Sequence, residues 1–131
     1  MRPRINDFDL QGVLNSKQYM DLVAEARIEQ MQRYYKVPIE TYFKRNQTWI
    51  LSRFLIHFAR PIRFYSSFFI HTQVARIEGP KSVVKFDFVS LDKKTTHASG
   101  EVDYYLLDLS TWKPVSMPEN ERLVFLEERS V

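Results

Sequence analysis

One helical pattern followed by four strand-like stretches is the sequence feature that limits the fold most. Apolar side chains recur at helical spacing over residues 19–35. Asn15 or Ser16 can cap the start of this helix, because a side-chain oxygen there accepts an N–H group that the first turn leaves free. Pro38 cannot continue a helix. The pattern therefore predicts one long helix that ends near Lys36.

The rest of the chain is dominated by the period of two that β-strands require. A short extended segment at residues 2–6, where Pro3 disfavours a helix, adds one more strand. A terminal strap is expected to end in a short helix over residues 119–127. The alternating stretches cover residues 49–59, 67–78, 82–91 and 97–109.

The apolar face of such a sheet needs a cover, and only the long helix can supply it. We therefore expect an α+β fold, a single domain over residues 1–131. It has an antiparallel five-stranded sheet, with the four long strands in a meander, wrapped around one long central helix. In two of the strands, the residues expected to face inward are Ile50, Phe54, Ile56, Phe58, Val84, Phe86 and Phe88.

Composition narrows the classes of function. The chain is 44% apolar and 15% aromatic, as expected for a packed domain, and it has no cysteine. Disulfides, thiolate metal ligands and cysteine nucleophiles are thereby excluded, which fits a cytoplasmic protein. No apolar run is long enough to cross a membrane, and no secretion signal is visible. The net charge of +3 suits a phosphate-bearing ligand but falls short of a nucleic-acid footprint.

The segment from Asp9 to Asn15 combines an acidic side chain, a glycine turn and the start of the predicted helix. A carboxylate beside free backbone N–H groups is what hydrolysis of an acyl ester or thioester needs. The chain has only three glycines, which favours a specific role for Gly12. From the residues alone, the alternative is a helix-capping loop with a solvated aspartate. Asp7 is a second carboxylate nearby.

Further motifs follow in a fixed order along the chain. The first group lies at and before the predicted helix: Asp9-Leu10-Gln11-Gly12, Val13-Leu14, Asn15, Tyr19 and Glu25-Ala26-Arg27. The second group lies in the later part of the chain: Phe58-Ala59-Arg60-Pro61, residues 97–102, Leu107-Asp108 and residues 113–118. In these motifs, over about residues 4–122, the chain resembles the hotdog-fold acyl-CoA thioesterases of the 4-hydroxybenzoyl-CoA thioesterase type. The resemblance implies hydrolysis of an acyl-CoA thioester to a free acid and coenzyme A.

The resemblance also implies roles for individual residues. Asp9, in the Asp-x-x-Gly motif with Gly12, is the expected catalytic carboxylate, either as a nucleophile or as the base that activates water. Backbone N–H groups near Ser16 are expected to hold the oxyanion, aided by the helix dipole. Asn15 and Tyr19 match family motif positions and are assigned to substrate binding. Asp7 lies outside the motif register and is interpreted as structural or solvated.

Two positions depart from the family pattern. Many members carry His, Asn or Tyr where Ser16 stands, and many carry His where Val13 stands. These differences concern the substrate more than the chemistry, because the carboxylate and the helix start remain. They leave open a second function, a non-catalytic module that binds an acyl thioester or an acyl carrier protein.

The remaining candidates concern ligands and partners. Arg60 and Arg63 are assigned to the phosphates of coenzyme A. The three histidines have no metal-ligand spacing, so neither a metal nor a cofactor is expected. Glu25 is an alternative carboxylate, since another branch of hotdog thioesterases uses a helix glutamate. The expected partners are acyl-CoA or an acyl carrier protein, and a second copy of the chain in a homodimer or a dimer-of-dimers tetramer. Nucleic acid is not expected, because the aromatic residues alternate into the core instead of accompanying clustered basic ones. A membrane is not expected either, because no apolar run is long enough to cross one.

Overall fold

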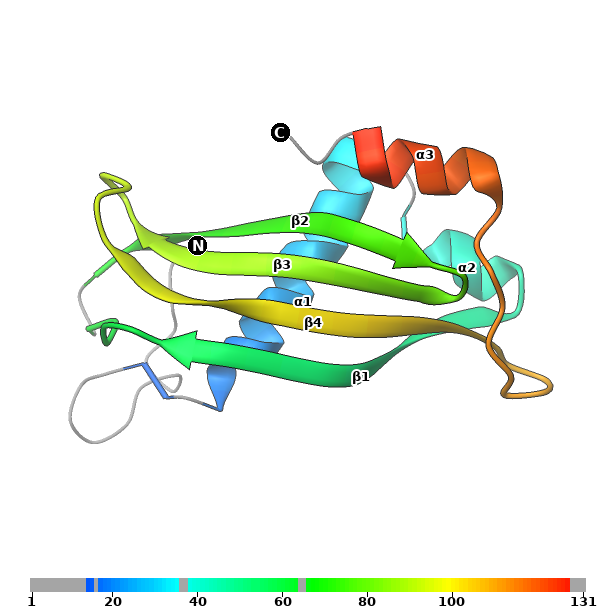
Figure 1. Ribbon diagram of the computed structural model, residues 1–131, viewed down its shortest axis with the longest axis horizontal. Helices are drawn as coiled ribbons and strands as arrows, with labels where there is room; N and C mark the ends of the chain where they lie inside the picture. The colour runs from blue at the N-terminus through cyan, green and yellow to red at the C-terminus, as the bar shows by residue number, and fades with distance from the viewer. Residues whose placement is uncertain (1–13, 16, 36–37, 64–65, 128–131) are drawn as a thin grey trace.

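The computed structural model describes residues 14–15, 17–35, 38–63 and 66–127. In this part of the chain a four-stranded antiparallel sheet has the order β1-β4-β3-β2, with α1 crossing one of its faces (Figure 1). The strands are β1 Gln47–Phe58, β2 Phe68–Glu78, β3 Lys81–Ser90 and β4 Thr96–Asp108, and the helices are α1 Gln18–Gln30, α2 Glu40–Lys44 and α3 Glu119–Glu127. The α+β architecture of an antiparallel sheet packed on a helix is confirmed.

The single long helix is a wrong prediction. The α-helix α1 has 13 residues and passes at Met31 into a π-helical segment, η2 Met31–Tyr35. A separate short helix, α2, follows Pro38, whose carbonyl accepts the Thr41 N–H at 2.9 Å. A π turn adds about one residue per turn. The spacing of apolar residues in the sequence does not distinguish this π-helical turn from an α-helical one.

The sheet differs from the predicted meander in the place of its first long strand. Strands β2, β3 and β4 are consecutive neighbours, but β1 pairs with β4 and not with β2. β1 is therefore an edge strand of the described sheet. Four strands are seen in the described residues where five were expected, and the strand predicted at residues 2–6 lies outside them.

A bulge in β1 changes which of its side chains face the helix. The pairing with β4 shifts between Leu51 and Arg53, which leaves Ser52 as an extra residue. Trp49 and Leu51 therefore pack against the core together with Phe54. Ile50 faces away and is 39% exposed, so its predicted place on the inner face is wrong.

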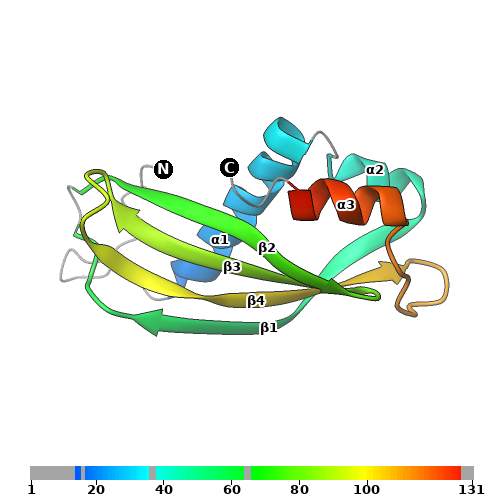
Figure 2. The same ribbon diagram turned by 45° about the horizontal axis from the view of Figure 1, so that its top comes forward.

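Aromatic side chains of the sheet build the core beneath α1. Phe88 and Leu106 are fully buried, and Tyr19 and Val23 of α1 pack onto the same cluster. The inward orientation predicted for Val84, Phe86 and Phe88 is confirmed, since all three are buried. The end of the sheet where β2 turns into β3 is covered by α2 and α3 (Figure 2).

We predict that Phe88→Ala lowers the free energy of unfolding by about 3–5 kcal/mol, because it leaves a cavity among packed rings. The Phe88 ring lies 4.8 Å from that of Tyr19 and 5.7 Å from that of Phe68. Urea unfolding measures the change. Phe43→Ala is the matched control, since Phe43 is 53% exposed, and it is expected to cost under about 0.5 kcal/mol. Equal losses in both variants would contradict this view of the core.

Candidate active site

The start of α1 is closed by a short turn. Asn15 Oδ1 accepts the Lys17 N–H at 2.9 Å, and the Asn15 carbonyl accepts the Gln18 N–H at 2.9 Å. The N-cap residue is Lys17, so the prediction that Asn15 or Ser16 holds this position is wrong in register. Asn15 still uses its side chain as a cap does, two residues before Lys17. The N–H groups of Tyr19 and Met20 have no acceptor within the helix, because the first turn of any α-helix leaves its N–H groups unpaired.

The loop that follows β1 packs against this helix start. The Leu14 N–H donates to the Ile62 carbonyl at 2.7 Å, and both side chains are buried. Arg60 and Arg63 lie on the same loop with exposed side chains. Two cations therefore lie on a loop anchored beside the N-terminal end of α1, where the helix dipole is also positive.

Tyr19 lies in the core and not on the surface of this end. Its ring meets Phe58 edge-on, with centroids 5.0 Å apart, and it also contacts Phe88. Burial raises the pKa of Tyr19 from 10.0 to about 12. The phenol is therefore protonated and neutral at ordinary pH. Its assignment to substrate binding stays a prediction.

The raised pKa of Tyr19 predicts a loss of stability at high pH. Between pH 10 and pH 12 the unfolded chain has released this proton while the folded chain still holds it. Stability is therefore complete below pH 10 and falls as the pH rises toward 12. Tyr19→Phe removes the proton, so its unfolding free energy is expected to decline less steeply over this range. Equal slopes in urea titrations of wild type and variant would contradict the prediction.

Three of the predicted site residues, Asp9, Gly12 and Ser16, lie outside the described residues, as do Asp7 and Val13. Their roles stay predictions from the sequence. The described residues Asn15, Arg60 and Arg63 belong to two segments that the Leu14–Ile62 hydrogen bond joins at one end of the fold.

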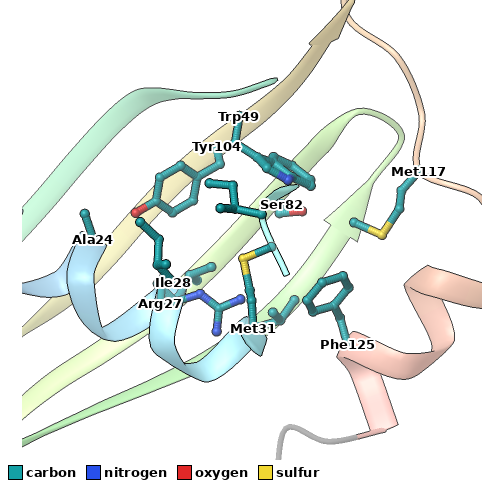
Figure 3. A pocket seen from close by; sticks show the side chains of 12 residues that line it. Ala24, Arg27, Ile28, Met31, Trp49, Ser82, Tyr104, Met117 and Phe125 are labelled. Atoms are coloured by element: carbon teal, nitrogen blue, oxygen red, sulfur yellow. The ribbon is translucent and has the colours of Figure 1, made fainter. Parts of the chain in front are cut away.

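A cavity of about 200 Å³ lies further along α1 and was not predicted from the sequence. Figure 3 shows its wall, with Ala24 and Tyr104 at one end and Met117 and Phe125 at the other. Its lining residues come from α1, η2, all four strands and the C-terminal strap. They are Ala24, Arg27, Ile28, Met31, Ile39, Trp49, Val74, Ser82, Val84, Tyr104, Met117 and Phe125.

Few polar groups face this cavity. The Arg27 guanidinium donates to Gln30 Oε1 at 2.8 Å and to Thr72 Oγ1 at 3.3 Å. Burial raises the pKa of Tyr104, so its phenol is neutral. Trp49 Nε1 is buried with no hydrogen-bond acceptor among the described atoms. The wall therefore suits an apolar group. The i, i+4, i+7 spacing of Ala24, Ile28 and Met31 was the available sequence signal.

Two pairs of titratable side chains lie on outer surfaces. His71 and Asp87 form an exposed pair at 3.3 Å, and Glu29 pairs with Arg33 at 3.2 Å on the solvent side of the helix. No cluster of three or more potential metal ligands occurs among the residues that the structure describes. Within the same residues, no helix has the length and apolar character to span a membrane.

Comparisons with known proteins agree with this architecture. The sequence matches the model of the thioesterase-like superfamily over residues 3–124. No curated protein matches it. The probable thioesterase YbaW from Escherichia coli superposes with a TM-score of 0.83 at 16% identity, covering 98% of this chain and 96% of that one. Slr0204, a 1,4-dihydroxy-2-naphthoyl-CoA thioesterase from Synechocystis, gives 0.85 at 12% identity, covering 95% and 91%.

A third neighbour extends the likeness. The DHNA-CoA thioesterase from Staphylococcus aureus superposes with a TM-score of 0.82 at 16% identity, covering 88% of this chain and 76% of that one. These structural similarities establish the fold, and the match over residues 3–124 establishes the family. The chain belongs to the thioesterase-like superfamily and is a thioester hydrolase of the hotdog fold.

Proposed function

We propose that this enzyme hydrolyses an acyl-CoA thioester to a free acid and coenzyme A, with Asp9 as the catalytic carboxylate. The observation that carries the proposal is the Leu14–Ile62 hydrogen bond, which joins the segment just before α1 to the loop bearing Arg60 and Arg63. The Asp-x-x-Gly motif lies a few residues before that start. The thioesterase family match supplies the reaction class.

Two routes satisfy the chemistry. In one, the Asp9 carboxylate attacks the thioester carbonyl, the C–S bond breaks, and water then hydrolyses the acyl anhydride. In the other, Asp9 takes a proton from water as that water attacks the carbonyl, and the departing thiolate receives a proton. Both pass through an oxyanion. N–H groups of the first turn of α1 stabilise it, and one such donor is typically worth about 3 kcal/mol.

Coenzyme A brings several phosphate groups, which suit the two arginines beside the helix start. We predict that Arg60→Ala and Arg63→Ala each raise KM for an acyl-CoA about fivefold, with kcat little changed, because each removes an exposed charge pair worth about 1 kcal/mol. A thioester of N-acetylcysteamine lacks the phosphates, so its KM is expected to stay unchanged. Arg76→Ala, on β2, is the matched control. A KM rise for both substrates would contradict the assignment.

A homodimer, or a tetramer built from two dimers, belongs to the same proposal. The outer edge of β1 has no strand beside it in the described sheet. Phe58 and Leu55 of this strand are 49% and 53% exposed. An unpaired edge with apolar neighbours favours association with a second copy. A chain without cysteine suits a reducing compartment, and the proposed location is the cytoplasm.

Thiol release separates this function from its alternative. Purified protein is given acetyl-, dodecanoyl- and benzoyl-CoA, and free coenzyme A is measured with a thiol reagent. Release from at least one of these thioesters at enzymatic rates is expected. Tight binding of an acyl-CoA without thiol release would instead support the non-catalytic module, in which Val13 and Ser16 replace the polar residues that many family members carry.

A further inference from the structure

The cavity described above is aligned with the axis of α1. Ala24, Ile28 and Met31 line it and share one face of the helix and its π-helical continuation. Met20 lies on the same face one turn earlier and is 41% exposed. An apolar stripe therefore runs from the first turn of α1 to the cavity. Trp49, on β1, faces the stripe across the cavity (Figure 3).

The far end of the cavity is closed by the C-terminal strap. Met117 and Phe125 are 5% and 3% exposed and stand opposite the Ala24 end (Figure 3). The strap is held in place by the salt bridge between Arg45 and the buried Glu121, 2.6 Å long. The cavity thus has a fixed wall at the end formed by Met117 and Phe125.

The polar group of Arg27 does not prevent an apolar occupant. Its guanidinium is bound to Gln30 and to Thr72 of β2, whose hydroxyl also hydrogen-bonds Gln30. The alkyl part of a long cationic side chain can line an apolar space while its charged end is satisfied elsewhere. Val74, Val84 and Ile39 make up much of the remaining wall.

The distances along α1 set the length of an acyl group that could use this space. At 1.5 Å per residue, Ala24 lies about 9 Å and Met31 about 20 Å along the axis from Gln18. An extended alkyl chain advances ~1.2 Å per bond, so roughly eight carbons span from the helix start to Ala24. A volume of about 200 Å³ holds roughly six more, at ~30 Å³ for each methylene-sized group.

We propose that the cavity binds the distal half of a straight-chain acyl group of about 12–14 carbons, whose thioester lies at the start of α1. The assignment names the substrate class and rests on the proposed function. A single aromatic ring attached to the thioester carbonyl ends before Ala24 and leaves the cavity empty. Long aliphatic thioesters are therefore the preferred substrates.

Chain length is the variable that tests this assignment. For wild type, kcat/KM is expected to rise by about fourfold for each methylene between 8 and 12 carbons, the value for burying one CH₂ group, and to fall beyond about 14. Ala24→Phe places a ring in the near end of the cavity and is expected to move the optimum to 8 carbons or fewer. Glu29→Phe adds the same ring on the solvent side of the helix and is expected to keep the wild-type profile.

A second variant changes a residue deeper in the cavity than Ala24. Ser82→Leu, nearer to Met117 than Ala24 is (Figure 3), is expected to shorten the optimum by only two to four carbons. It keeps the test usable if Ala24→Phe does not fold, which melting temperatures reveal. A chain-length profile that is flat in wild type, or unchanged in whichever of the two cavity variants folds, would overturn the assignment.

Binding measurements distinguish failure of the assignment from failure of the proposed function. Calorimetric affinities of Asp9→Asn for butyryl- and dodecanoyl-CoA require no turnover. Dodecanoyl-CoA is expected to bind at least tenfold more tightly, and Ala24→Phe is expected to remove the difference. Equal affinities would reject the cavity as an acyl site even if thiol release is observed. A chain-length preference in binding without any thiol release would reject hydrolysis but keep the acyl site.

Discussion

Gly100→Ala is expected to lower the free energy of unfolding by more than about 4 kcal/mol, the largest stability loss that we predict for this fold. Gly100 lies in β4 between Ile56 of β1 and Phe86 of β3. A Cβ atom at this position would lie 1.9 Å from the Leu55 carbonyl oxygen and 2.9 Å from the Phe86 ring. Because backbone of the neighbouring strand cannot rotate aside, the β1–β4 pairing itself must shift.

The control for this effect is another glycine. Gly79 forms the β2–β3 turn at φ +60°, and the nearest atom to an added Cβ is Ser116 Oγ at 3.8 Å. Gly79→Ala therefore meets no steric conflict and carries only the cost of a left-handed backbone, about 1–2 kcal/mol. Urea unfolding of both variants measures the contrast. A Gly100→Ala protein as stable as Gly79→Ala would show that β1 and β4 are not as close as described.

Much of the sheet is predictable because alternation is a local property. The strands β2, β3 and β4 and the helix α3 were expected within a few residues of their observed bounds. The β2–β3 turn lies at Gly79, where glycine precedes proline between two alternating stretches. A half-buried strand needs only a period of two, and the sequence displays that period directly.

The features that sequence reasoning missed depend on contacts between distant segments. The place of β1 beside β4 is decided by pairing between distant residues, from Gln47 with Asp108 to Phe58 with Ala98, which no local pattern contains. The register between β1 and β4 shifts at Ser52, which forms a bulge. Because of this bulge, Ile50 faces away from the core. The cavity forms only where α1, the four strands and the C-terminal strap meet. The sequence alone therefore could not predict that Ala24 and Phe125 line the same cavity.

The candidate site was predicted in part. Family motifs selected Asn15 and Tyr19, and the phosphates of coenzyme A suggested Arg60 and Arg63. The structure places the first two at the start of α1 and the arginines on the adjoining loop. Tyr19 turned out to be a core residue, since one helical position does not reveal how deep a ring lies. Asp9 rests on the sequence motif alone.

Asp9→Asn is expected to reduce kcat for thioester hydrolysis by about a thousandfold or more. An amide is neither a nucleophile of comparable strength nor a base at neutral pH, so both proposed routes lose the group that starts the reaction. The size of the side chain and its hydrogen-bonding reach are nearly unchanged, so folding and substrate binding are expected to persist. Asp7→Asn is the matched control, two residues away and with the same loss of charge, and it is expected to keep kcat within a few-fold.

The decisive measurement is the rate of thiol release from dodecanoyl-CoA at saturating concentration by wild type, Asp9→Asn and Asp7→Asn. Melting temperatures equal to that of wild type show that both variants are folded. The account predicts full turnover by wild type, near-full turnover by Asp7→Asn, and a loss of about a thousandfold or more in Asp9→Asn. Full activity in Asp9→Asn would contradict the assignment of the catalytic carboxylate and, with it, the placement of the reaction at the start of α1.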